Sequence, residues 1–256
     1  MDSSGKKLTT YITTNVMIVS YFFALFIPRF NDIARCYLIS KTNNIKISTS
    51  LGTVFSERIF DLISLLILSA IFILIEFDLF YGFIENYVLS NIEFNTTTYL
   101  LIFGSLIVLF FILRYFSKKS SFISSNLNEF KLGVLTIKEN YKNKGFLIST
   151  FLLWLIYFLM GYVIFFSFTE TTDLGVNAGI AVLVAGSIGM IVPVNAGIGA
   201  YHFLVASILL SYNLDYESGL FFATLLHTSQ IVCLAILGII SSIILFFKIK
   251  SNNEYN

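Results

Sequence analysis

The sequence predicts an all-α protein: a polytopic transmembrane helical bundle with two proline-broken or re-entrant segments and one cytoplasmic amphipathic helix. Three observations support this fold class. The 256 residues are 57% hydrophobic and only 12% charged, and their mean hydropathy of +0.84 far exceeds that of soluble domains. Apolar stretches long enough to cross a bilayer core of about 30 Å recur along the chain. The two prolines, Pro28 and Pro193, each interrupt one such stretch.

We expect one membrane domain over residues 1–256, with five clear spans and one broken span. They lie at about 8–28, 57–77, 98–116, 146–169, 176–211 (broken) and 219–247. Between the third and fourth, apolar residues recur at alternating four- and three-residue steps, which predicts an amphipathic helix at about 121–142. Its lysines suit anionic headgroups at the cytoplasmic interface; the alternative is a connector packed on the bundle.

Lys and Arg in the loops predict the orientation, because cytoplasmic loops are enriched in them. Residues 114–145 hold one arginine and six lysines, whereas residues 76–97 hold four acidic residues and neither Lys nor Arg. The first of these loops is therefore predicted to be cytoplasmic and the second external. The same rule places the C-terminal tail, with Lys248 and Lys250, on the cytoplasmic side of the cell (inner) membrane.

The loop charges place both ends of the N-terminal segment on the same side of the membrane. Lysines near the N-terminus favour a cytoplasmic start, and Lys41 and Lys46 place the next loop on the same side. A single crossing at about 8–28 cannot satisfy both. A re-entrant hairpin that breaks at Pro28 and returns over 30–41 satisfies both. Broken backbone at membrane depth requires protein or a watery cavity beside it.

The first group of charges follows Pro28, where Arg29, Asp32 and Arg35 are spaced by three residues and so share one helical face. A charge inside an apolar segment costs at least ~2.5 kcal/mol at the helix centre, so such residues usually face partners, cavities or substrates. A carboxylate between two guanidiniums leaves net positive charge, and the planar fork of arginine suits phosphate. The alternative is an interfacial set of salt bridges at a helix end.

The second group, Glu57, Arg58 and Asp61, is predicted to open the next apolar helix. Glu57 and Asp61 lie one turn apart, and Arg58 lies three residues before Asp61. The helix dipole stabilises acids near an N-terminus by ~0.3 to 1 kcal/mol. This alternative explains Glu57 well, but it accounts poorly for Arg58 and for the deeper Asp61.

The prolines also indicate an internal repeat. With Pro28 superposed on Pro193, Tyr37 aligns with His202, and two broken apolar segments occupy corresponding places in the two halves. Paired interrupted segments are the best sequence pointer to a transporter site.

The second break carries further candidates. Asn195 lies within it, and Gly197 and Gly199 allow close backbone approach and expose peptide groups. His202, just beyond the glycines, is a candidate for titration or headgroup binding; the alternative is a hydrogen-bonded core histidine. His227 in the last span indicates interhelical hydrogen bonding.

Several function classes are disfavoured. The net charge of +1 argues against a nucleic-acid partner, which would need a basic face. Cys36 and Cys233 lie in separate apolar contexts, which indicates packing residues rather than a metal site or a disulfide. Nucleotide-binding, zinc-protease and nucleophile-elbow motifs are absent from the sequence. We therefore expect no cofactor and no metal, and ATP-driven transport would require another chain.

Three elements, in order, resemble a known family. Residues 27–35, Ile-Pro-Arg-Phe-Asn-Asp-Ile-Ala-Arg, resemble the P-x-R-x-G-E-x-x-R segment of the lysylphosphatidylglycerol synthase transmembrane region, also called flippase-like membrane proteins. Residues 52–61 are similar to its E-R-x-x-D helix start, and residues 193–199 to its late P-x-x-x-G-x-G element. The resemblance covers about 15–247. It implies a polytopic bundle that moves lipids with charged or glycosylated headgroups between leaflets.

The sequence departs from the family pattern at two places. Asn31 and Asp32 stand where Gly and Glu are usual, and His202 stands where a glutamate often follows the glycines. These departures bear on headgroup selectivity and on proton coupling. Family members usually carry further membrane segments before the Pro-Arg element, so the resemblance implies a shortened homologue or a partial gene product. Some relatives attach an aminoacyl-transferring domain, which we do not expect here.

Our first hypothesis is a flippase-like protein that translocates or binds a lipid with an anionic or phosphate-bearing headgroup. Three arginines are expected to face phosphate in one cavity, held by neighbouring acids. The expected site consists of Arg29, Asp32, Arg35, Glu57, Arg58, Asp61, Asn195, Gly197, Gly199 and His202. The second hypothesis is a non-transporting membrane partner of a lipid-modifying enzyme, and a homo-oligomer is possible in either case. The third is a membrane enzyme that uses Glu57, Asp61 or His202 as acid or base; we expect no enzyme.

Overall fold

The computed structural model describes residues 9–43, 45–83 and 134–254, together with positions 85, 104, 128 and 131. All regular elements in this part of the chain are helices, which confirms the predicted all-α class. The predicted span at about 98–116, apart from position 104, and half of the predicted amphipathic helix at about 121–142 lie outside the described residues. Near the end of that predicted helix, the structure has the short helix α7, Ile137–Asn140.

Three helices are long and apolar enough to cross a membrane: α3, Ile47–Ile75; α8, Lys144–Ile164, continued by the 3₁₀ turn η2; and α12, Tyr216–Glu254. Two shorter apolar segments contain α10, Val176–Ile191, and α11, Ala200–Leu210. The remaining described helices are α1, Thr10–Ala24; α2, Asn31–Asn43; α4, Phe77–Phe83; and α9, Thr169–Thr172, with a second 3₁₀ turn, η3, at Asn195–Gly197.

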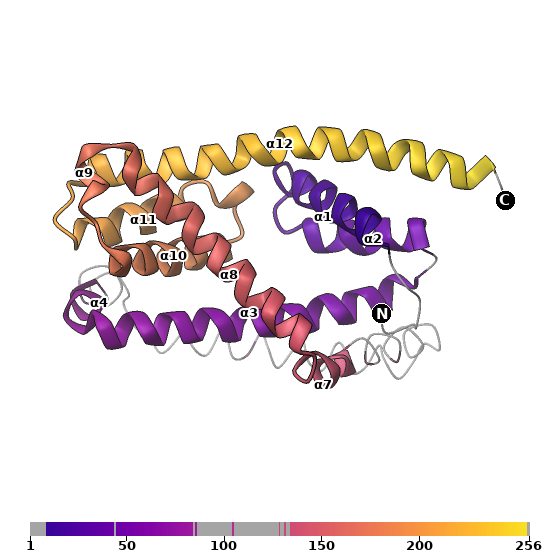
Figure 1. The fold of residues 1–256 in the computed structure, drawn as a ribbon, viewed down its shortest axis with the longest axis horizontal. Helices are drawn as coiled ribbons and strands as arrows, with labels where there is room; N and C mark the ends of the chain where they lie inside the picture. Colours follow the sequence, from indigo (N-terminus) through magenta and orange to yellow (C-terminus); the bar gives the residue numbers. More distant parts are fainter. Residues whose placement is uncertain are drawn as a thin grey trace.

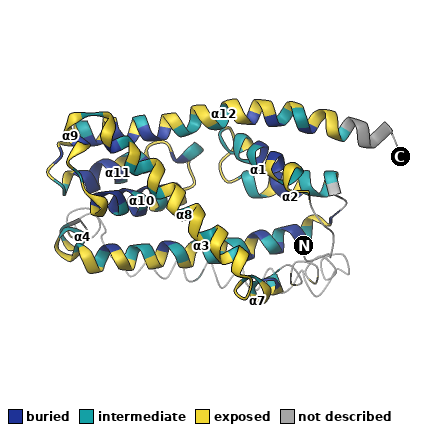
Figure 2. Cartoon of the chain, in the orientation of Figure 1, coloured by how far each residue is buried: buried dark blue, intermediate teal, exposed yellow. Residues whose placement is uncertain are grey.

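Large apolar side chains on the long helices face outward. Leu74 of α3 is 84% exposed, Phe151 of α8 is 66% exposed and Phe246 of α12 is 65% exposed. Figure 2 shows exposed residues along much of α3 and α8. A soluble protein would bury so many large apolar groups, so lipid is the solvent that suits this surface.

Four of the shorter helices form two hairpins. α1 packs on α2, and α10 packs on α11. In the first hairpin the chain turns between Ala24 and Asn31, around Pro28. In the second, α10 ends at Ile191, and Val192 before Pro193 is extended, as the residue before a proline prefers. The predicted broken stretch at 176–211 thus folds back on itself instead of continuing along one axis.

The two hairpins lie between the two longest helices (Figure 1). α12 packs on both α11 and α1, while α3 packs on both α2 and α10. In Figure 1 the open end of the α1–α2 hairpin faces the side of the chain termini, whereas the open end of α10–α11 lies near α4 and α9. The hairpins therefore point toward each other from opposite ends of the bundle.

The main core surrounds the second hairpin. Val205 and Leu209 of α11, Phe222 and Ala223 of α12, and Phe165 of η2 are all fully buried. Figure 2 shows this concentration of buried residues around α10 and α11. The second hairpin is consequently held by packing on several helices, which leaves its tip as the part free to contact the first hairpin.

One sequence prediction is wrong about a helix start. α3 begins at Ile47, ten residues before Glu57, whereas the sequence was expected to open this helix at Glu57. The dipole effect falls off within the first turn of a helix, so it does not explain the carboxylates of Glu57 and Asp61. The apolar run that suggested the later start is only the uncharged part of a longer helix.

Candidate functional site at the hairpin tips

Arg29 connects the tip of the first hairpin to the second hairpin. Its guanidinium donates hydrogen bonds to the carbonyl oxygens of Met190, at 3.1 Å, and of Ile191. These carbonyls lie in the last turn of α10, where backbone acceptors have no partner within the helix and the helix dipole is negative. The break at Pro28 therefore meets the chain just before the break at Pro193.

The backbone of Arg29 is held in the left-handed region, with φ of 60°. A non-glycine residue in this region is uncommon and costs free energy. Here the surrounding structure compensates, because this conformation carries the guanidinium to the end of α10. Arg29 precedes α2, which begins at Asn31, so it does not share a helical face with Asp32 and Arg35. That part of the sequence prediction is wrong.

The second tip is built from backbone that favours glycine. Ala196, Gly197 and Gly199 have φ values of 50°, 74° and 91°. Gly197 is buried, and a Cβ atom there would collide with the sulfur of Met190. Asn195, by contrast, is exposed at the start of η3. Met190 thus contacts both tips, through its carbonyl oxygen to Arg29 and through its side chain to Gly197.

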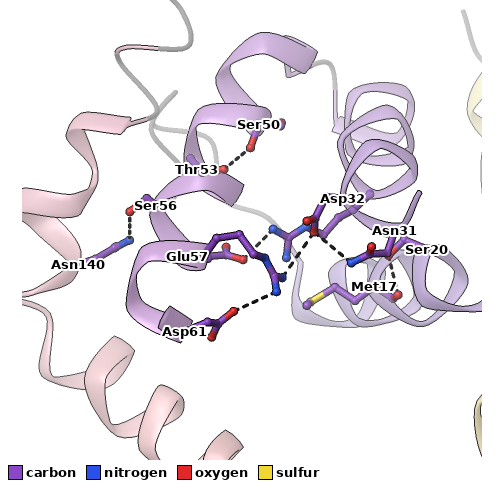
Figure 3. A network of polar contacts seen from close by, with 12 residues as sticks. Met17, Ser20, Asn31, Asp32, Ser50, Thr53, Ser56, Glu57, Asp61 and Asn140 are labelled. Atoms are coloured by element: carbon purple, nitrogen blue, oxygen red, sulfur yellow. Dashed lines mark hydrogen bonds and ion pairs between the residues drawn. The ribbon is translucent and has the colours of Figure 1, made fainter. Parts of the chain in front are cut away.

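Beside the first tip, a partly buried ion pair joins α2 to α3 (Figure 3). The Arg35 guanidinium lies 2.7 Å from a carboxylate oxygen of Glu57. The side chain of Arg35 is only 7% exposed, whereas that of Glu57 is 39% exposed. Arg35 is therefore not accessible enough to take a headgroup phosphate, and it instead holds Glu57 in place.

A second pair of contacts extends the network along α3. Arg58 lies 3.1 Å from Asp61, one turn away on the same helix, and 3.5 Å from Asp32 of α2. The three side chains are 42%, 31% and 30% exposed, respectively. Arg58 also forms a side-chain hydrogen bond with Tyr21 of α1. Arg58 is the accessible guanidinium of this group.

We call these five residues, Asp32, Arg35, Glu57, Arg58 and Asp61, the α2–α3 network. Three carboxylates face two guanidiniums, so its formal charge is −1. The sequence led us to expect net positive charge around Asp32. The expectation is wrong for this network because Arg29 contacts α10 and because α3 contributes two carboxylates but one arginine.

Comparison with known proteins confirms the family that the sequence resembles. The chain matches the family described as the lysylphosphatidylglycerol synthase TM region over residues 1–238. It belongs to this family. The chain is also 30% identical over 204 residues to UPF0104 membrane protein MJ1078 of Methanocaldococcus jannaschii, an alignment that covers 78% of this chain and 82% of the relative. No solved structure is significantly similar to it.

The structure divides the residues of the predicted site into two groups. Asp32, Arg35, Glu57, Arg58 and Asp61 come together in the α2–α3 network. The guanidinium of Arg29 instead contacts the end of α10. The second tip, next to this contact, holds Asn195, Gly197, Gly199 and His202. Arg29 is the hydrogen-bonded link between the two hairpin tips among the described residues.

Two tyrosines near the network were not predicted. Tyr21 bonds Arg58, and Tyr157 of α8 lies within electrostatic reach of Asp61 and Arg58. The chain has 14 tyrosines, and neither their spacing nor their context distinguishes these two. Their position near the network depends on how the fold places α1 and α8 relative to α3. They bring two further helices to the network.

Proposed function

We propose that this chain is a flippase-like protein that binds lipid headgroups at the hairpin tips and moves lipids between leaflets. The single observation that carries the proposal is the meeting of two helical hairpins, tip to tip, beside a charged network. Broken helices that meet inside a bundle form the substrate sites of many membrane transporters, because their ends offer unpaired backbone groups and side-chain charges.

Loop charges support a placement of both tips inside the membrane. At the open end of the first hairpin lie Lys41 and Lys46, and at the open end of the second lie Glu170 and Asp173. Cytoplasmic loops are enriched in Lys and Arg, so we infer that the first hairpin enters from the cytoplasm and the second from outside. α12 then returns the chain to the cytoplasm.

The α2–α3 network has the chemistry to hold a headgroup. A guanidinium binds phosphate through charge-assisted hydrogen bonds, and Arg58 is the partly exposed one. The carboxylates of Asp32 and Asp61 flank it and can accept hydrogen bonds from hydroxyl or amino groups of the same headgroup. Arg35 is a positioning residue in this arrangement, because its buried guanidinium orients Glu57.

The surface between α8 and α12 offers room for an acyl chain. A groove of about 460 Å³ runs between these helices. Its α8 side is apolar and includes Leu159 and Val163, and its α12 side includes Ser229 and Gln230. An acyl chain in such a groove would remain in an apolar environment while its headgroup moved toward the polar interior of the bundle.

The test is lipid translocation by the purified chain in liposomes. Vesicles would carry acyl-labelled phosphatidylglycerol, phosphatidylethanolamine or phosphatidylcholine with a fluorophore that an impermeant reductant quenches. Passive vesicles lose about half of the signal, because only the outer leaflet is accessible. We expect the chain to raise the quenched fraction for at least one of these lipids.

Matched variants connect the activity to the site. Arg58→Gln removes the accessible guanidinium and should slow translocation at least tenfold, whereas Lys248→Gln removes one positive charge at the far end of α12 and should leave it unchanged. Quenching equal to that of protein-free vesicles for all three lipids would refute the proposal. Equal rates for Arg58→Gln and the wild type would refute the role of the α2–α3 network.

A further inference from the structure

The chain has two histidines, and they lie against each other at the second hairpin tip. His202 comes from α11 and His227 from α12, yet their ring centroids are 5.1 Å apart. The Tyr201 ring lies 4.7 Å from that of His227. Two imidazoles at this distance cannot take up protons independently of each other.

The neutral ring of His202 forms a hydrogen bond that holds the backbone of the second tip in place. Its Nδ1 atom accepts a hydrogen bond from the backbone N–H of Gly199, at 3.4 Å. Gly199 is the N-cap of α11 and His202 is the third residue of that helix. A proton on Nδ1 would remove the acceptor and place a positive charge at the positive end of the helix dipole, where cations are disfavoured.

His227 offers a vacant acceptor beside this bond. Its side chain lies in the interior, with only 4% of the residue exposed, and a hydrogen bond joins its ring to the backbone of Ala196. Within the part of the chain that the structure describes, no group bonds to its Nδ1 atom. A buried acceptor without a partner is costly, and Nδ1 is the position that a proton would fill.

We propose that the His202–His227 pair is a proton-binding site whose occupancy loosens the tip of the second hairpin. One proton enters the pair, on Nδ1 of either ring. On His202 it breaks the bond from Gly199. On His227 it places a charge beside His202 and the N-terminus of α11. The bond from Gly199 supports the backbone at Ala196–Gly199, which follows the α10 residues bound by Arg29, so this segment loosens when His202 is protonated.

Few other ionisable groups surround the pair. α11 contributes Tyr201, and α10, which packs on α11, carries no titratable residue. The other helices on α12 are α1 and α8, whose ionisable residues are Tyr11, Tyr21, Tyr157, Tyr162 and Lys144 at the start of α8. From the first hairpin, Arg29 is engaged with the α10 carbonyls. The helices α1, α8, α10 and α11 carry no carboxylate, so none from these helices competes for the proton.

The distance between the rings predicts how the pair titrates. Two unit charges 5.1 Å apart at an effective dielectric constant of about 20 separate the two protonation steps by about two pH units. The pair should therefore hold one proton over a broad pH range.

The first experiment is a histidine NMR titration of the untagged full chain in nanodiscs, with ¹⁵N-labelled imidazoles. Because the chain has two histidines, the spectrum contains two ring systems. We expect two macroscopic steps separated by about two pH units. In His202→Gln the remaining histidine should titrate in one simple step. Independent titration of both rings, or no change for His227 in the variant, would overturn the proposal.

The second experiment measures hydrogen-exchange protection factors for residues 195–203 from pH 5 to pH 8. We expect protection in the wild type to fall at least tenfold at the low end. The double variant His202→Gln, His227→Gln retains side-chain acceptors at both positions but does not titrate there, so its protection should be independent of pH. Exchange near Gly219, elsewhere on α12, is the internal control. Wild-type protection that does not change with pH refutes the coupling, whatever the outcome of the lipid assay.

Discussion

Arg35→Ala should destabilise the chain more than Arg58→Ala does, although both remove one arginine from the same network. Arg35 is 7% exposed and lies 2.7 Å from Glu57, whereas Arg58 is 42% exposed and lies 3.5 Å from Asp32. Unit charges about 4 Å apart attract by about 4 kcal/mol at an effective dielectric constant of 20. The 39% exposure of Glu57 reduces this value, so we expect a coupling of ~1 to 3 kcal/mol for Arg35–Glu57.

Double-mutant cycles measure both couplings directly. Arg35→Ala, Glu57→Ala and their combination form one cycle, and Arg58→Ala, Asp32→Ala and their combination form the control. The free energy of unfolding would be measured by denaturant titration in mixed micelles. The control cycle should give less than ~1 kcal/mol, as exposed pairs do. Equal coupling in both cycles, or less than about 0.5 kcal/mol for Arg35–Glu57, would show that burial does not set the strength of this pair.

Two further predictions concern helix packing and capping. Gly189→Ala should destabilise by ~1 to 3 kcal/mol in the same titration, because its Cβ would lie 2.7 Å from the Cα of Tyr201, whereas Gly82→Ala, with nothing within 4 Å, should not. The Ser218 backbone N–H donates to the Asp215 carboxylate at 2.9 Å and lowers the pKa of that carboxyl. The Asp215 contribution to stability is therefore present above its ordinary pKa of 3.8 and is lost as pH falls through the lower folded value. Asp215→Ala should reduce the loss of stability as pH falls below about 4; an unchanged pH profile would contradict the cap.

The sequence alone determined the membrane setting and the residues that deserve study. Composition and apolar lengths indicated a helical membrane protein because burial in lipid requires both. Proline placed both breaks, because it lacks the N–H that a helix interior needs. Charges in apolar segments identified Asp32, Arg35, Glu57, Arg58 and Asp61, which the structure does bring together.

Only the tertiary structure decided which of these charges pair. Spacing along one helix predicted that Arg29 would pair with Asp32, but the helix starts after Arg29, and its guanidinium instead reaches α10. The contact of His202 with His227 joins residues from two helices, and periodicity within either helix contains no information about it. Local sequence patterns indicate which residues are polar and where they lie along an apolar segment. The partner of each is set by how helices distant in sequence pack, because that packing decides which buried charges and acceptors lie within bonding distance.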